Sequence, residues 1–206
     1  MSQPLIEATR EMNPDTSSSS LVPRIAVLIP CYNEAAAITT VIENFAAALP
    51  KATIYVYDNN STDDTAHLAH AAGAIVRSES LQGKGNVVRR MFADIEAEVY
   101  VLVDGDGTYD AASAPSMVEM LLNNSLDMVN GARVATSDPA YRPGHAFGNR
   151  LLTHSVAIIF GSRIRDMLSG YRVISRRFIK SFPALASGVE TEAELTVHAL
   201  GLGLPI

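Results

Sequence analysis

The sequence predicts an α/β protein in which helices flank a mostly parallel sheet. Short apolar runs rich in β-branched residues alternate with segments of helical period, which is typical of this architecture. Of the 206 residues, 48% are apolar and 18% are charged, which is the composition of a folded domain with a buried core. Polar clusters follow several of the apolar runs, at the positions where open α/β sheets bind their ligands.

Six apolar runs are predicted to form strands, and six segments of helical period are predicted to form helices. The strands are expected at residues 25–30, 54–58, 74–77, 99–103, 127–131 and 171–175. The helices are expected at residues 34–49, 63–72, 85–96, 112–123, 145–161 and 190–200. Asn33 is predicted to cap the first helix, and Thr62 precedes two aspartates suited to the first turn of the second.

Residues 1–23 carry charges, prolines and a serine run, which predicts a disordered tail ahead of one domain at residues 24–206. The tail lacks the apolar stretch of a secretory signal, and no apolar run approaches the ~20 residues of a membrane-spanning helix. We therefore expect a cytoplasmic protein. Residues 133–180 contain nine basic and two acidic side chains, which predicts either a solvated face or a surface that meets a phosphate or an anionic membrane.

Asp104 and Asp106 carry the strongest chemical signal. They follow the strand predicted at 99–103 and are two residues apart, so in extended chain both can point to the same side. Carboxylate oxygens, completed by phosphate and water, are the ligands that Mg²⁺ or Mn²⁺ prefers. The alternative is a simple polar turn, because Asp-Gly pairs are common in turns. The position at a strand end favours the metal site.

Residues 82–86 open a predicted helix and offer Lys84 to an anion. Ser78 stands where a Walker A loop has its first glycine, and Val88 stands where a dinucleotide-binding fingerprint has its third. These departures disfavour an ATPase and a dehydrogenase. The histidines show no zinc spacing, and Cys31 is interpreted as a small buried residue and not as a nucleophile.

Five short motifs follow one another along the chain. They are Pro30 to Glu34 (PCYNE), Asp58 to Thr65 (DNNSTDDT), Gly83 to Gly85 (GKG), Asp104 to Asp106 (DGD) and Ser169 to Arg172 (SGYR). This ordered set resembles the inverting glycosyltransferases of the GT-A fold, a Rossmann-like α/β fold. Within them it is most similar to the polyprenyl-phosphate group, which includes dolichol-phosphate mannose synthase. The resemblance extends from residue 24 to the end of the chain.

The resemblance implies a role for each matched residue. Pro30, Tyr32 and Glu34 would line the nucleoside pocket, Asp58 and Asn59 would lie near the base and ribose, and Lys84 would lie beside the nucleotide. Asp104 and Asp106 would hold the metal, and Arg133 and Arg172 would face the acceptor phosphate. Glu190, Glu192 and Glu194 would lie near the acceptor side, although helical spacing puts Glu192 on a different face from the other two.

The resemblance also implies the reaction, which is metal-dependent transfer of a sugar from a UDP- or GDP-sugar to a polyprenyl phosphate. The protein would act at the cytosolic face of the membrane, with no nucleic-acid partner. An ionised phosphate acceptor needs no strong base, whereas a hydroxyl acceptor needs a carboxylate such as Glu192 or Asp166. Transfer to a saccharide or other hydroxyl is one alternative, and a non-catalytic nucleotide-sugar-binding module is another.

Two departures from the family pattern qualify these expectations. Asn59 stands where the family commonly has a second aspartate, which leaves the nucleobase open. The chain ends at Ile206, where many members continue into a linker and membrane helices. The expectation is therefore either a fragment of a membrane-anchored protein or a protein with peripheral membrane contact.

Overall fold

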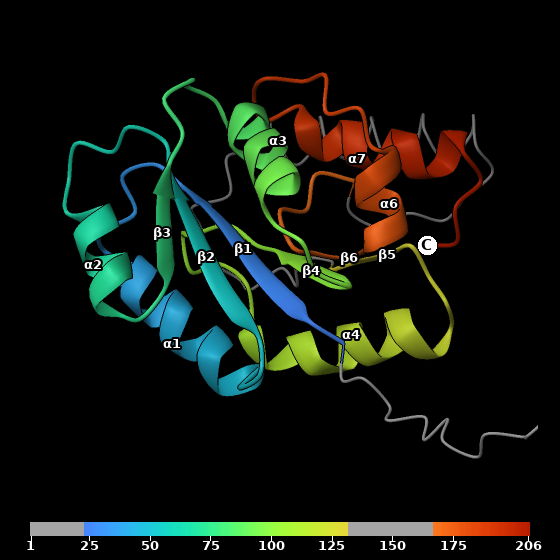
Figure 1. Ribbon diagram of the computed structural model, residues 1–206, viewed down its shortest axis with the longest axis horizontal. Coiled ribbons are helices and arrows are strands. Elements are labelled where there is room, and N and C mark those ends of the chain that lie inside the picture. Colours follow the sequence, from blue (N-terminus) through green and yellow to red (C-terminus); the bar gives the residue numbers. More distant parts are fainter. Residues whose placement is uncertain (1–22, 132–166) are drawn as a thin grey trace, which may run out of the picture.

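A six-stranded sheet lies between two layers of helices in the computed structural model, which describes residues 23–131 and 167–206 (Figure 1). The order of the strands across the sheet is β3-β2-β1-β4-β6-β5. Their bounds are β1 (Ile25–Cys31), β2 (Thr53–Asp58), β3 (Ile75–Ser78), β4 (Val99–Leu102), β5 (Met128–Asn130) and β6 (Arg172–Ser175). The predicted fold class is confirmed, and all six predicted strands are present within two residues of their expected bounds.

The four strands β3, β2, β1 and β4 run parallel, whereas β6 is antiparallel to β4 and β5 is antiparallel to β6. Cys31 at the end of β1 is in register with Asp58 at the end of β2. Because parallel strands end at the same edge of a sheet, the loops after β1, β2 and β4 meet there. The polar motifs of the sequence are in these loops.

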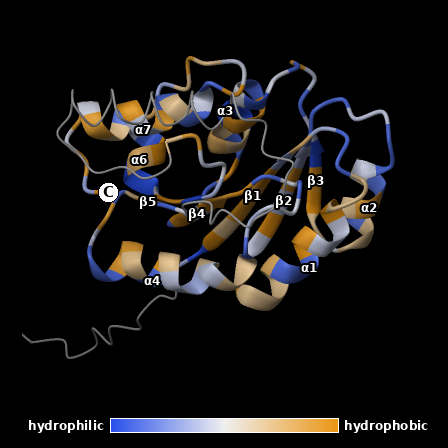
Figure 2. Cartoon of the chain, turned by 180° about the vertical axis from the view of Figure 1, so that it is seen from behind, coloured by the Kyte–Doolittle hydropathy of each residue, from blue (hydrophilic) through white to orange (hydrophobic). Residues whose placement is uncertain are grey.

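The side chains of β1 alternate between the two faces of the sheet, as the pleat requires. Val27 and Ile29 pack under the layer formed by α1 (Ile38–Ala48), α2 (Thr65–Ala71), the short 3₁₀ helix η1 (Ala111–Ser113) and α4 (Ala114–Asn123). Ala26 and Leu28 pack under the layer formed by α3 (Lys84–Asp94), α6 (Arg176–Ser181) and α7 (Thr191–Gly201). Figure 2 shows hydrophobic residues concentrated along the strands between these layers.

The first helix begins later than predicted. α1 starts at Ile38, and the predicted cap Asn33 instead has a left-handed backbone with φ of 57°. The Asn33 side chain accepts hydrogen bonds from the backbone N–H and the hydroxyl of Thr62, at 2.8 and 3.3 Å. The prediction of an Asn33 cap was wrong because this side chain joins the β1 loop to the β2 loop.

The second loop also differs from a simple helix start. α2 begins at Thr65, and one oxygen of the Asp63 carboxylate accepts from the Thr65 backbone N–H at 3.1 Å. The other oxygen accepts from the Ala35 N–H at 3.1 Å. Asp63 and Asn33 thus tie the two loops together, and this contact fixes the edge of the sheet where the polar motifs lie.

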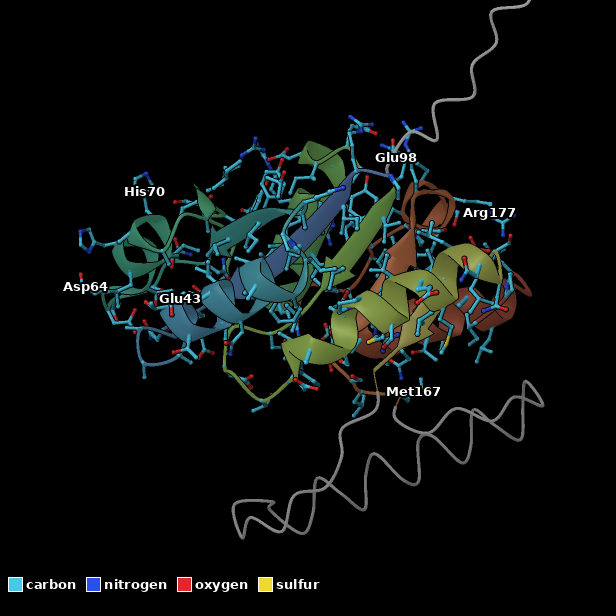
Figure 3. The ribbon with its side chains drawn as sticks, turned by 90° about the horizontal axis from the view of Figure 1, so that it is seen from below. Glu43, Asp64, His70, Glu98, Met167 and Arg177 are labelled. Atoms are coloured by element: carbon cyan, nitrogen blue, oxygen red, sulfur yellow. The ribbon has the colours of Figure 1, made fainter. Side chains whose placement is uncertain are left out.

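The helix α6 was not predicted. Ser175 caps it, because its hydroxyl accepts from the Phe178 N–H at 3.1 Å. A serine at the last position of a predicted strand was the available signal. α6 lies at one end of the sheet, where Figure 3 shows Arg177, and α2 with Asp64 and His70 lies at the other.

Two sequence predictions lie outside the described residues: the tail at 1–23, apart from Pro23, and the helix at 145–161. Within the described ranges, no helix has the length and apolar character needed to cross a bilayer.

The start of α3 packs against the loop between α6 and α7 without room for a side chain. The backbone N–H of Gly85 donates to Ser187 O at 3.1 Å. A Cβ added at Gly85 would lie 2.8 Å from the carbonyl carbon of Ala186, closer than packed atoms approach. This contact holds the beginning of α3 in place.

Gly85→Ala is expected to destabilise the fold by about 1–3 kcal/mol, because the added methyl group meets backbone atoms. Helix propensity alone predicts the opposite sign, a gain of roughly 1 kcal/mol. Gly201→Ala is the matched control, since nothing lies within 4 Å of a Cβ added there. Urea unfolding of both variants measures the difference, and equal stability of the two would contradict the packing described here.

Candidate active site

A cleft of about 450 Å³ opens at the carboxyl ends of β1, β2 and β4. It is lined by loops after these strands, by the start of α3 and by the start of α7. Eight of the predicted site residues line it: Pro30, Tyr32, Glu34, Asn59, Lys84, Asp104, Asp106 and Glu192. Cys31, Gln82, Gly83, Val87, Gly105 and Val189 complete the lining and were not predicted as site residues. The convergence of the strand-end motifs on one site is therefore present in the structure.

The Asp104-Gly-Asp106 turn is held by close backbone packing. A Cβ on Gly170 would lie 2.5 Å from the Asp104 Cγ, so only glycine fits beside this carboxylate. A Cβ on Gly105 would lie 2.7 Å from the Cys31 sulfur. The Asp106 carboxylate accepts from the Thr108 N–H at 3.0 Å and from its hydroxyl at 2.7 Å. Both aspartates are thereby fixed at the edge of the cleft.

Cys31 is buried beneath this turn, with 3% of its surface exposed. Burial raises the pKa of the thiol well above its usual range, and the nearby Glu34 carboxylate adds to the effect. The thiol therefore stays protonated at neutral pH. This agrees with the interpretation of Cys31 as a small buried residue and not as a nucleophile.

The Lys84 ammonium lies between two carboxylates. It donates a hydrogen bond to Asp104 Oδ1 and another to Glu192 Oε1. Burial works against the charged ammonium, but the two carboxylates outweigh it and raise the pKa of Lys84. Burial also raises the pKa of Glu192, despite its contact with Lys84. The three side chains form a partly buried charge cluster at the floor of the cleft.

The cleft as a whole is acidic. Glu34, Asp104, Asp106 and Glu192 line it, and Lys84 is the single cationic side chain among the described lining residues. Burial raises the pKa of Glu34, and Asp106 and then Asp104 raise it further. An excess of carboxylates in one cleft favours the binding of a cation there.

The donor set suits Mg²⁺ or Mn²⁺, which take one or two carboxylates together with phosphate and water. In residues 23–131 and 167–206, no group of three or more His, Cys, Asp or Glu side chains has the arrangement of a metal cage. A metal held by Asp104 and Asp106 would therefore take its remaining ligands from a bound phosphate and from water.

Residues 26–182 match the model of glycosyl transferase family 2. The match covers most of the chain. The chain belongs to glycosyl transferase family 2.

Three curated relatives of this family 2 protein are informative. Protein RfbJ of Shigella flexneri is 59% identical over 59% of this chain and 95% of its own. Glycosyltransferase AglJ of Haloferax volcanii is 37% identical over 87% of this chain and 59% of its own. The dolichyl-phosphate hexose transferase of the same organism is 26% identical over 75% of this chain and 68% of its own. The chain thus spans little more than half the length of AglJ.

Solved structures give the same fold. Glucosyl-3-phosphoglycerate synthase from Mycobacterium tuberculosis, in complex with Mn²⁺, UDP and phosphoglyceric acid, superposes with a TM-score of 0.73 at 25% identity. The match covers 88% of this chain and 65% of that one. A complex of the same enzyme holds Mg²⁺ and UDP. This structural neighbour therefore binds a divalent metal together with a nucleoside diphosphate.

Asn59 organises the loop that leads into α3 of this family 2 transferase. Its amide nitrogen donates to Glu79 O at 2.8 Å and Leu81 O at 2.9 Å, and its amide oxygen accepts from the Gly83 N–H at 2.7 Å. An aspartate, common at this position in the family, has no hydrogen to donate to the two carbonyls. The structural role of Asn59 is therefore to clamp the loop that carries Lys84.

Asp58 lies beside Asn59 but is not among the residues that line the cleft. It is 8% exposed, and its Oδ2 atom accepts from the Ser61 N–H at 3.1 Å. Its Oδ1 atom is buried without a hydrogen-bond partner among the described residues. Such an acceptor carries a desolvation cost that a donor group on a ligand would relieve.

Arg172, which was expected to face an acceptor phosphate, is not among the residues that line the cleft. The residue is fully buried, with 0% of its surface exposed. Its guanidinium donates to the carbonyls of Ser169, Met167 and Glu192 and to the Thr196 hydroxyl. These bonds join β6 to α7, so Arg172 positions the helix that carries Glu192.

The three glutamates at the start of α7 separate as helical spacing predicted. Only Glu192 lines the cleft. Glu194 accepts from the Leu185 and Ala186 N–H groups at 2.8 and 3.0 Å, and Glu190 accepts from the Gly188 N–H at 3.0 Å. Arg133 and Asp166, the remaining candidates, lie outside the described residues.

Asn59→Asp is expected to destabilise the protein by roughly 2–4 kcal/mol, because a buried carboxylate would then face two carbonyl oxygens. Asn60→Asp is the control. Asn60 donates to Ser80 O at 3.0 Å and Gln82 Oε1 at 3.2 Å but is exposed, so its loss costs less. Chemical unfolding measures both, and similar stabilities of the two variants would contradict the loop-clamp role.

Arg172→Met is expected to cost roughly 3–5 kcal/mol, because it leaves several buried oxygens without a donor. Arg176→Met, which removes an exposed ion pair with Glu96, should cost less than about 1 kcal/mol. Thermal and urea unfolding compare the two variants. A stable Arg172→Met protein that has lost only acceptor binding would restore the original expectation.

Proposed function

We propose that this family 2 glycosyltransferase moves a sugar from a nucleoside-diphosphate sugar to a polyprenyl phosphate, with inversion at the anomeric carbon. The observation that carries the proposal is the acidic cleft at the strand ends, in which Asp104 and Asp106 lie with Lys84. A divalent metal, Mg²⁺ or Mn²⁺, would be held by Asp104 and Asp106. When bound, it supplies positive charge to the departing nucleoside diphosphate.

The donor would lie along the loops after β1 and β2. The buried Oδ1 atom of Asp58 needs a hydrogen-bond donor, and a nucleobase N–H supplies one. Pro30 and the half-exposed ring of Tyr32 would flank the nucleoside. UDP in complexes of the mycobacterial synthase supports a UDP-sugar over a GDP-sugar. Asn59 would act indirectly, by holding the loop of Lys84.

The acceptor part of the proposal rests on charge and on one relative. A phosphate that is already ionised attacks without a strong general base, so the chain needs only to orient it. The basic residues between 133 and 180 suit that task, with Arg133 proposed to face the phosphate and the buried Arg172 proposed to position α7. The relative named dolichyl-phosphate hexose transferase supports this acceptor class. Peripheral contact with the cytosolic face of a membrane follows from such a substrate.

A hydroxyl acceptor is the second candidate. Glu192 lies in the cleft and burial raises its pKa, which suits a group that takes a proton. The name of the mycobacterial synthase, glucosyl-3-phosphoglycerate synthase, describes a soluble acceptor of this kind.

A labelled UDP-sugar incubated with undecaprenyl phosphate and Mn²⁺ tests the acceptor. The expected product is lipid-linked and moves into organic solvent. A labelled water-soluble glycoside, with no label in the lipid fraction, would replace the polyprenyl acceptor by a hydroxyl acceptor.

Asp104→Asn and Asp106→Asn are each expected to lower kcat by about 10²–10³-fold, because charge on the leaving diphosphate is no longer compensated. Asp110→Asn is the matched control from the same segment. Its carboxylate accepts from the Ala112 N–H at 3.0 Å outside the cleft, a role that asparagine also fills. Wild-type kcat in either of the first two variants would remove that aspartate from the mechanism.

A further inference from the structure

Resting on the proposed function, we infer that Lys84 is the resident counter-cation of the cleft and couples metal binding to nucleotide binding. Its ammonium contacts the Asp104 carboxylate. A nucleoside diphosphate draws the ammonium away, and Asp104 then becomes free to hold the metal.

The Lys84 ammonium and a metal held by Asp104 would use the same carboxylate. A Cβ added at Gly170 would lie nearest to one carboxylate oxygen of Asp104, Oδ2. The other oxygen, Oδ1, accepts from the Lys84 ammonium. A divalent metal bound to this carboxylate would lie close to the ammonium, and two cations at such a distance repel each other. The metal therefore competes with Lys84.

Lys84 is well held at this position. It is the first residue of α3, and its side chain is only 15% exposed. The preceding Gly83, with φ of 125°, donates from its backbone N–H to the buried Asn59 amide at 2.7 Å. The backbone at Lys84 is thus fixed, and the exchange involves the side chain alone.

Glu192 keeps the ammonium in the cleft during the exchange. It contacts Lys84 independently of Asp104 and is 13% exposed. Lys84 can therefore leave Asp104 for a phosphate oxygen while it still contacts Glu192. The phosphate neutralises the ammonium, and the released Asp104 gains the metal.

This exchange has a thermodynamic consequence. If the nucleotide removes a competitor of the metal, the nucleotide raises metal affinity, and the metal raises nucleotide affinity by the same factor. Part of the coupling arises because the phosphates themselves ligate the metal. The part due to Lys84 disappears when the ammonium is removed.

The experiment measures free Mn²⁺ by electron paramagnetic resonance during titrations of the protein, with and without UDP. In the wild type we expect weak Mn²⁺ binding alone and tighter binding with UDP. Lys84→Met should tighten binding without UDP by about tenfold, within the usual range of coupling between sites. The ratio of the affinities with and without UDP should fall by a similar factor.

The ratio of the Mn²⁺ affinities with and without UDP distinguishes two effects of Lys84. One is the exchange of its contact with Asp104, and the other is the general electrostatic effect of its positive charge. A distant positive charge would weaken Mn²⁺ binding equally in both states, so its removal would leave the ratio unchanged, and that result would overturn the inference. Lys180→Met is the matched control, since Lys180 contacts Glu96 on the surface and should alter neither affinity.

Glu192→Gln is the second variant and keeps the test decisive if Lys84→Met fails to fold. Because residue 192 is then neutral, Lys84 should bind Asp104 more strongly. Mn²⁺ binding without UDP should therefore weaken, and the ratio of the affinities with and without UDP should rise. An unchanged ratio would count against the exchange. Mn²⁺ binding that Asp104→Asn leaves unchanged would instead refute the proposed metal site itself.

Discussion

The contact of the Lys84 ammonium with Asp104 and Glu192 is the interaction on which the candidate site depends. It joins the end of β4, the start of α3 and the start of α7. Without a cation, two partly buried carboxylates would face each other in one cleft, at a high electrostatic cost. The same three charges also set what the cleft can bind, because they leave it acidic with one exchangeable cation.

The rest of the molecule fixes the three segments that meet at this contact. Parallel pairing of β1, β2 and β4 brings their loops to one edge of the sheet. Asn59 holds the loop before α3, and Arg172 joins β6 to α7. Glycines at positions 85 and 170 allow the backbone to approach where a side chain would collide. Most of this support consists of buried hydrogen bonds, not of contacts that a ligand would make.

Much of the fold and part of the site could be predicted from the sequence. Alternation of apolar runs and helical segments predicted all six strands, and strand-end motifs identified Glu34, Asp104 and Asp106 as neighbours. Lys84 was assigned to the site by the start of its predicted helix and by the family resemblance. These inferences succeed because they use local patterns and the rule that parallel strands end together.

The wrong cap and the contacts that were not predicted concern interactions between distant segments. Lys84 and Glu192 are 108 positions apart, so no local pattern reports their contact. Asn33 satisfies the residue preferences of a helix cap but bonds Thr62 on another loop. Arg172 has the charge of a phosphate ligand, yet tertiary packing surrounds it with carbonyl groups. Asn59 lines the cleft, as expected, but its bonds to the loop before α3 could not be predicted from the local sequence.

The most direct measurement for the central claim is anomalous scattering from Mn²⁺ in crystals of the protein grown with UDP. The account predicts a manganese peak between the carboxylates of Asp104 and Asp106 and the diphosphate, with the Lys84 ammonium displaced from Asp104. A nucleotide bound in the cleft with no manganese at these aspartates, or with manganese held elsewhere, would contradict it.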